Sequence, residues 1–106
     1  MVNGFKIITL CGSTRFKTQF IEMQKKLSLK GYIVISVGLF GHSGDNEVWQ
    51  DGIKEMLDKQ HLAKIDLSDE IFVINPGGYI GQSTSKEIKY AKEKGKKIHY
   101  LENPTE

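Results

Sequence analysis

Two glycine- and hydroxyl-rich segments carry the residues best suited to hold a phosphorylated ligand. The first is Gly12-Ser13-Thr14-Arg15, which directly follows an apolar run and precedes a helical pattern. Glycine lets the backbone approach a ligand closely, and the free N–H groups of a helix start favour an anion. Arg15 can add two parallel hydrogen bonds to a phosphate group. An ordinary helix start, capped by Ser13 or Thr14 with Arg15 in solvent, is the alternative interpretation.

The second segment, residues 76–85, holds three glycines, one aromatic residue and three hydroxyl side chains. It stands between another apolar run and another helical pattern. We expect Gly81 to let the chain approach a ligand, and Ser83 and Thr84 to cap the helix or to bind phosphate or sugar. Tyr79 either covers a base or sugar or folds over the edge of the sheet. A purely structural turn would seldom need so many of these residues.

Glu87 follows in the first or second turn of the helix that this segment opens. A carboxylate near a helix N-terminus is stabilised in its charged form. Facing a ribose, it could attack the anomeric carbon or stabilise a transition state that resembles an oxocarbenium ion. The structural alternative is that glutamate is favoured in a first turn for capping and dipole reasons alone.

Apolar, β-branched runs alternate along the chain with amphipathic helical patterns. Strands are predicted at residues 6–11, 32–37, 70–75 and 97–101, and helices at 16–30, 48–67 and 82–94, with a long loop at 38–46. Alternating strands and helices imply right-handed crossovers and a parallel sheet that is covered on both faces. The fold class predicted is therefore α/β, a flavodoxin-like (Rossmann-like) three-layer sandwich with four parallel strands in the order 2-1-3-4.

This strand order has a topological switch point between the first and third strands. Ligands of open α/β sheets bind there, outside the carboxyl ends of the strands. The two glycine-rich segments meet at that point, so we expect one shared site. Phe40, His42, Asp45 and Trp49 lie in or beside the long loop above the same edge, where they form either a lid over a base or a hydrophobic anchor for the loop.

Composition places limits on the protein class. With 106 residues, 39% hydrophobic and 26% charged, the chain fits one domain, residues 1–106. A net charge of +2 is too small to indicate a nucleic acid or a membrane surface as partner. The single cysteine, Cys11, suits a reducing compartment, and neither a signal peptide nor a membrane-spanning run is apparent, so we expect a cytoplasmic protein.

The spacing of the histidines gives no metal-binding pattern. His42, His61 and His99 lie far apart in the sequence, and Cys11 ends a buried strand, where a small hydrophobic role is expected. No metal and no cofactor are therefore predicted. Asp66 and Asp69 are expected to be structural, at the turn from a helix to a strand.

At these residues the chain resembles the nucleoside 2-deoxyribosyltransferase superfamily, which includes the 2'-deoxynucleoside 5'-phosphate N-hydrolases and the CMP N-glycosidases. The resemblance is specific in three places, residues 11–15, 66–73 and 81–91. It implies that Ser13, Arg15 and Ser83 hold phosphate or sugar and that Glu87 is the nucleophile. The implied reaction is cleavage or transfer of an N-glycosidic bond through a glycosyl-glutamate intermediate.

The chain departs from that family at two positions. His61 stands where the family usually has an aspartate that protonates or orients the departing base, and Leu10 stands where it has an aromatic residue. A histidine can donate a proton near neutral pH, so His61 is a candidate proton donor. It also falls on the apolar stripe of its helix, which is typical of a core histidine, and a helix break near residues 59–60 is expected if it is to reach the site.

The predicted function is therefore cleavage or transfer of the N-glycosidic bond of a small nucleoside or nucleoside 5'-monophosphate. A weaker likeness to the cytokinin-activating phosphoribohydrolases, carried by residues 76–87, points to the same bond. The alternative is a non-catalytic module of the same fold that binds or senses a nucleotide or nucleotide-sugar. A homodimer is expected, because family members commonly complete their sites across a dimer.

Overall fold

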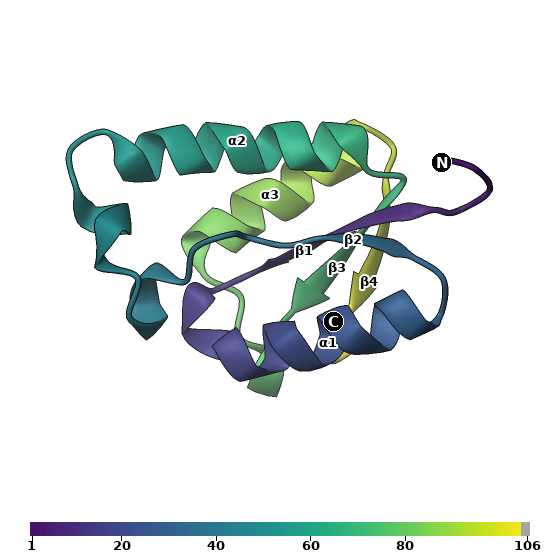
Figure 1. The fold of residues 1–106 in the computed structure, drawn as a ribbon, viewed down its shortest axis with the longest axis horizontal. Helices are drawn as coiled ribbons and strands as arrows, with labels where there is room; N and C mark the ends of the chain where they lie inside the picture. Colours follow the sequence, from purple (N-terminus) through teal and green to yellow (C-terminus); the bar gives the residue numbers. More distant parts are fainter. Residues whose placement is uncertain (105–106) are drawn as a thin grey trace.

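Four parallel strands and three helices alternate along the chain in the computed structural model, which describes residues 1–104 (Figure 1). The elements are β1 (Ile7–Gly12), α1 (Lys17–Leu29), β2 (Ile33–Ile35), α2 (Ile53–Leu67), β3 (Glu70–Ile74), α3 (Gln82–Glu93) and β4 (Lys97–Tyr100). Among these residues no helix combines the length and the apolar character needed to cross a membrane.

The sheet has the order β2-β1-β3-β4, and every pairing is parallel, which confirms the predicted fold class. Leu10 of β1 pairs in register with Phe72 of β3, and Val73 of β3 with Tyr100 of β4. Because β1 and β3 are central and neighbours, their carboxyl ends lie side by side at the switch point.

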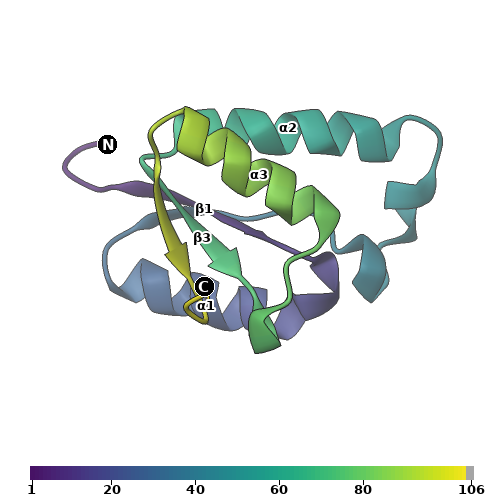
Figure 2. The same cartoon turned by 180° about the vertical axis from the view of Figure 1, so that it is seen from behind.

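Helix α1 covers one face of the sheet, and α2 and α3 together cover the other (Figures 1 and 2). Successive side chains of a strand point to opposite faces. In β1, Ile8 and Leu10 therefore join the cluster under α1, while Cys11 joins the cluster under α2 and α3. The central strands β1 and β3 are buried on both faces, as their nearly continuous apolar runs indicated, whereas the edge strands β2 and β4 are partly exposed.

The structure differs from the prediction in two elements that flank the long loop. Helix α2 begins at Ile53 and not at residue 48, because Gly52 takes a left-handed conformation (φ 77°) that separates it from the short 3-10 turn at Asn46–Trp49. Strand β2 is limited to three residues. The chain leaves the sheet after it, where Lys64 Nζ donates to the carbonyl of Ser36 at 2.8 Å.

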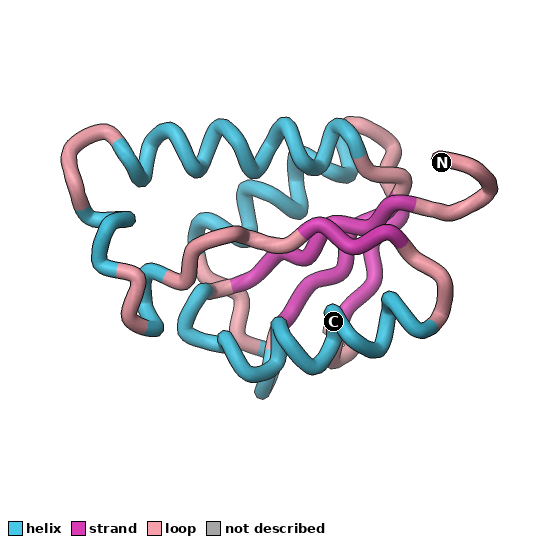
Figure 3. The backbone as a smooth tube through the Cα atoms, viewed as in Figure 1, coloured by secondary structure: helices cyan, strands magenta, loops and turns pink. Residues whose placement is uncertain are grey.

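The segment between β2 and α2 wraps past the carboxyl end of the sheet as a series of short turns (Figure 3). Phe40 anchors this segment, because its ring packs edge-on against Phe20 of α1, with 5.5 Å between ring centroids. Asp45 fastens it further by accepting a hydrogen bond from the backbone N–H of Phe40 at 2.6 Å. Of the two roles foreseen for these residues, Phe40 and Asp45 have the structural one.

Asp66 and Asp69 have the structural roles expected of them. Asp69 accepts the backbone N–H of Ile7 at 2.8 Å and so joins the turn after α2 to the start of β1. Asp66 accepts the hydroxyl of Tyr90 at 2.8 Å, which ties the end of α2 to α3.

A buried carboxylate links neighbouring segments at the amino ends of the strands. Glu70, at the start of β3, accepts hydrogen bonds from Tyr32 Oη (3.0 Å), Lys6 Nζ (3.2 Å) and His99 Nε2 (2.7 Å). Burial alone would raise the pKa of this carboxyl, but the three donors outweigh burial and hold it below its usual value. Glu70 thus links β3 to His99 of β4 and to Lys6 and Tyr32, which precede β1 and β2.

We expect Glu70→Gln to destabilise the protein at neutral pH by about 2 kcal/mol, because three charge-assisted hydrogen bonds are weakened. A carboxyl with a lowered pKa in the folded state contributes stability that is present above the ordinary value of 4.5 and lost as pH falls further. The difference in the free energy of unfolding between wild type and variant, measured by urea unfolding, therefore becomes smaller below that pH. The exposed Glu22→Gln is the control, and an equal gap at pH 7 and pH 3 would contradict the assignment.

Candidate functional site

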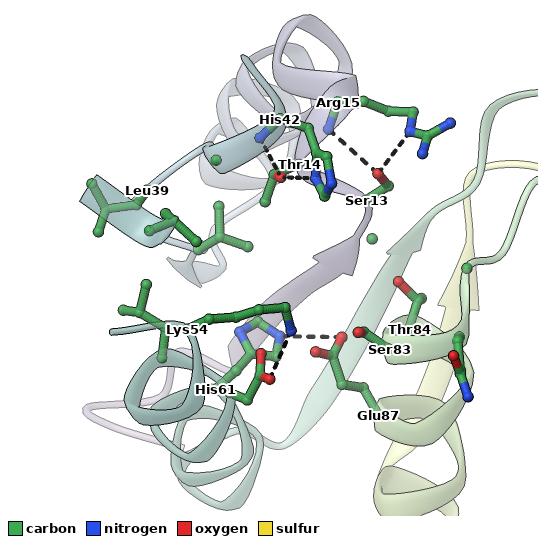
Figure 4. A pocket seen from close by; sticks show the side chains of 18 of the residues that line it. Ser13, Thr14, Arg15, Leu39, His42, Lys54, His61, Ser83, Thr84 and Glu87 are labelled. Atoms are coloured by element: carbon green, nitrogen blue, oxygen red, sulfur yellow. Dashed lines mark hydrogen bonds and ion pairs between the residues drawn. The ribbon is translucent and has the colours of Figure 1, made fainter. Parts of the chain in front are cut away.

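A cavity of about 300 Å³ opens at the carboxyl ends of β1 and β3. The ten residues that the sequence singled out all line it: Gly12, Ser13, Thr14, Arg15, His61, Tyr79, Gly81, Ser83, Thr84 and Glu87. Figure 4 shows Ser13, Thr14 and Arg15 on one side, facing Ser83, Thr84 and Glu87 of α3 and Lys54 and His61 of α2 across the opening.

The first loop leaves β1 in a sharp turn, and the position of this turn, residue 12, requires glycine. Gly12 has a φ of 154°, and a Cβ at this position would lie 2.7 Å from the carbonyl oxygen of Ile74. Ser13 then accepts a hydrogen bond from the backbone N–H of Arg15 (3.4 Å) and from its Nε (3.1 Å). The serine therefore caps the short 3-10 turn that precedes α1 and also orients the arginine.

Arg15 is placed as an exposed cation at the mouth of the cavity. Its guanidinium carbon lies 4.8 Å from the centre of the Tyr79 ring, a cation–π geometry. Within residues 1–104 its side chain donates one protein hydrogen bond, through Nε to Ser13. The terminal nitrogens of the guanidinium are left to bind an anion. Tyr79 thus positions Arg15, a role not foreseen from the sequence.

Thr14 connects the first loop to the wrapping segment. Its hydroxyl oxygen lies 2.9 Å from His42 Nδ1 and accepts the backbone N–H of His42 at 3.1 Å. Ser43 Oγ in turn donates to the carbonyl of Thr14 at 2.8 Å. Beyond it, the rings of His42 and Trp49 meet edge to face, with 5.1 Å between centroids. His42 and Trp49 both line the cavity, and the Trp49 side chain is half exposed at its rim.

The hydroxyls before Glu87 do not cap α3, so of the two roles foreseen for Ser83 and Thr84 the capping role is wrong. The N-cap position is held by Gly81, which offers no side chain, and neither Ser83 nor Thr84 makes a capping hydrogen bond. The helix begins at Gln82, two residues earlier than a cap at Ser83 would require. Its first N–H groups are therefore left to bind an anion.

Glu87 projects from the second turn of α3 into the deepest part of the cavity. Its side chain is only 16% exposed. Burial raises the pKa of this carboxyl to about 8, and the negative charge of Asp58 adds to the rise, while Lys54 opposes it. At neutral pH the carboxyl therefore holds a proton in the free protein.

His61 lies against Glu87 without any break in α2, which is continuous from Ile53 to Leu67. Contrary to the expectation from the sequence, a break near residues 59–60 is therefore not needed for His61 to reach the site, because α2 and α3 pack side by side on one face of the sheet. His61 Nε2 lies 3.7 Å from Glu87 Oε1 and 3.3 Å from Cys11 Sγ. Burial lowers the pKa of the imidazole to about 4, and the positive charge of Lys64 contributes. At pH 7 the imidazole is therefore neutral and the carboxyl is protonated, so the pair holds one transferable proton and no net charge.

Sequence reasoning missed two further groups in the cavity wall, Lys54 and Asp58. Lys54 Nζ donates to Asp58 Oδ2 at 2.9 Å, and both side chains are half exposed. With His61 they occupy positions i, i+4 and i+7 of α2, which form one helix face. That spacing is the signal in the sequence that could have revealed them. Most of the remaining wall is apolar and includes Val37 and Leu39.

We expect Glu87→Gln to stabilise the protein increasingly as pH rises from 4.5 to about 8, and to level off above. The folded state keeps the carboxyl protonated up to about pH 8, whereas the unfolded chain ionises near the ordinary 4.5. Wild type therefore loses stability across this window and the neutral glutamine does not. Paired urea titrations measure the gap, with Glu93→Gln on the same helix as control. A gap independent of pH would contradict the buried, protonated carboxyl.

Comparison with known proteins gives this chain no family. No protein-family model matches it, and a search of the curated proteins finds no match. The chemistry of the cavity therefore has to be inferred from its own residues.

Proposed function

We propose that the protein cleaves or transfers the N-glycosidic bond of a nucleoside 5'-monophosphate or a related small nucleoside. One observation carries the proposal: the Glu87 carboxyl faces an anion-binding loop across a cavity of about 300 Å³. A nucleotide has the matching order of groups, with its phosphate at one end, the anomeric carbon in the middle and the base beyond.

The phosphate end is supported by the charge at the cavity mouth. Arg15 supplies a guanidinium whose orientation is fixed by Ser13 and Tyr79. The uncapped N-terminus of α3 adds N–H groups from the opposite side, beside the hydroxyl of Ser83. Both features favour a dianion over a neutral ligand.

The reaction centre is supported by the contact between Glu87 and His61. A Glu87 carboxylate oxygen attacks C1' of the sugar, the C1'–N bond breaks, and its electron pair remains on the base nitrogen. The one proton that the pair holds passes through His61 to that nitrogen. Glu87 Oε1 and His61 Nε2 lie 3.7 Å apart, so the proton passes between neighbouring groups.

The second half of the reaction releases the sugar. Water, or a second base in a transfer reaction, attacks C1' of the glycosyl ester and expels the carboxylate. His61 accepts the proton that the attacking group loses, which restores the original pair. The proposed roles therefore use one proton and no external acid.

The base end is supported by the apolar wall and the polar residues beyond it. Leu39 and Trp49 present surface that a planar base can contact. Lys54 and Asp58 stand next to it with a donor and an acceptor that are both partly exposed. This arrangement favours a heterocycle with polar edges over an aliphatic leaving group.

We expect wild-type protein to release free base from at least one member of a panel of nucleosides and 5'-monophosphates, measured by chromatography. Glu87→Gln lowers that rate by at least about a hundredfold, because the amide cannot form the glycosyl ester. Glu93→Gln, on the exposed side of the same helix, keeps the wild-type rate. Full activity in Glu87→Gln would overturn the mechanism.

If no nucleoside or 5'-monophosphate of the panel releases base, the alternative function is tested next. Trp49 is the single tryptophan of the chain and lies at the rim of the cavity, so its fluorescence reports ligand binding. Stoichiometric quenching by a nucleotide without any released base would favour the non-catalytic binding module.

We expect Arg15→Gln to raise KM for a 5'-monophosphate by roughly tenfold to a hundredfold, because a charge-assisted contact to phosphate is lost. The KM of the matching nucleoside changes little, since it has no phosphate. The comparison is made with one base in both forms, and Lys17→Gln, a neighbouring exposed cation, is the control. An equal effect on both substrates would show that Arg15 does not bind the phosphate.

A further inference from the structure

Three side chains of metal-ligating type converge at the cavity wall, although they are far apart in the sequence: His61 and Glu87 line the cavity, and Cys11 is fully buried behind them. Cys11 comes from the end of β1, His61 from the middle of α2 and Glu87 from α3. One ligand atom of each lies within 4.8 Å of the other two. We propose that Cys11, His61 and Glu87 form a binding site for a zinc ion.

The distances suit tetrahedral zinc. Bond lengths of 2.3 Å to sulfur and 2.0–2.2 Å to nitrogen and oxygen place sulfur and nitrogen about 3.6 Å apart, and nitrogen and oxygen about 3.4 Å apart, at tetrahedral angles. The corresponding separations here are 3.3 Å between Cys11 Sγ and His61 Nε2 and 3.7 Å between His61 Nε2 and Glu87 Oε1. The third separation, between Cys11 Sγ and a Glu87 carboxylate oxygen, is within 4.8 Å, compared with about 3.6 Å in a tetrahedral site, so a side-chain movement of about 1 Å completes the geometry.

The chemistry of the donors selects the metal. One thiolate, one imidazole and one carboxylate are a zinc set, whereas Mg²⁺ and Ca²⁺ require oxygen ligands in larger number. A thiolate and a carboxylate also neutralise the two charges of the ion. A neutral complex is what an apolar layer can hold, since an unpaired charge there is costly to bury.

The surroundings leave these donors available to a metal. Within residues 1–104 the Glu87 carboxylate accepts no hydrogen bond, and the Cys11 thiol has one hydrogen-bond partner, His61. His61 and Glu87 point toward one another at the inner end of the cavity (Figure 4). Three protein ligands leave the fourth tetrahedral position open toward the cavity, as in zinc sites that keep a water.

Zinc at this site removes Glu87 from any other use. In the proposed reaction the same carboxylate must attack C1', so a bound ion inhibits base release. That consequence rests on the proposed function, whereas the binding of zinc does not.

The binding test uses Co²⁺ as a spectroscopic probe, added as cobalt chloride to protein treated with a chelator. We expect one equivalent to bind, with the thiolate-to-cobalt charge-transfer band and the intense visible bands of a tetrahedral ion. Zinc chloride then displaces the cobalt, and the charge-transfer band and the visible bands disappear. The assignment of the band to Cys11 is unambiguous because the chain has one cysteine.

Variants separate this site from incidental binding. Cys11→Ser loses the charge-transfer band, and Cys11→Ser, His61→Gln and Glu87→Gln each weaken zinc binding at least about tenfold. His42→Gln, which changes a histidine elsewhere in the cavity wall, keeps the wild-type affinity. Circular dichroism and the Tm of each variant establish that it is folded, and Cys11→Ala replaces Cys11→Ser where the serine variant is not. Wild-type zinc affinity in folded cysteine variants would overturn the proposal.

The metal site and the proposed reaction can fail separately. A cobalt spectrum with the charge-transfer band, in a protein that releases no base from any substrate, supports the site and counts against the reaction. Base release that persists at zinc concentrations saturating the cobalt-competition assay overturns the mutual exclusion. Absence of the charge-transfer band at saturating cobalt overturns the site and leaves the reaction standing.

Discussion

The contact between Glu87 and His61 is the constraint on which the site depends. Both side chains leave water and enter the apolar layer between the sheet and the pair of helices α2 and α3, where charge is disfavoured. Burial raises the pKa of the carboxyl and lowers that of the imidazole, so at neutral pH the carboxyl is protonated and the imidazole is neutral. A buried carboxyl costs stability, and the apolar cluster of the same layer, which includes Ile65 and Ile88, offsets that cost.

The parallel sheet places this pair through the alternation of β1. Because neighbouring side chains of a strand face opposite ways, Leu10 enters the layer under α1 and Cys11 the layer under α2 and α3. A shift of one residue would turn the thiol away from His61 and put leucine in its place. Gly12 then has to follow, since the carbonyl of Ile74 occupies the space of a Cβ. Strand β1 thus also fixes where the loop at residues 12–15 begins.

The sequence was sufficient for the sheet order and for the elements that flank the cavity, because apolar runs and glycine-rich turns are local signals. It was insufficient where distant segments decide the outcome. The periodicity from residue 48 continues through Gly52, and only the observed left-handed turn shows that α2 starts later. His61 was expected to need a helix break, since the packing of α2 against α3 cannot be read from either helix alone. The grouping of Cys11, His61 and Glu87 is invisible to spacing for the same reason.

The two ends of the cavity differ in their electrostatics, and this difference sets how ligands can share it. Arg15 at the mouth is an exposed cation that a phosphate can approach without leaving water completely. The inner end is buried and neutral, so it favours ligands that bring no net charge or that balance the charge of the groups already there. A zinc ion balanced by thiolate and carboxylate meets that condition, and so does the glycosidic centre of a nucleotide. Because both need Glu87 and neither needs Arg15 to change, competition between them is confined to the inner end. Under the two proposals, inorganic phosphate at the mouth is therefore compatible with a bound metal, whereas base release from a nucleotide is not.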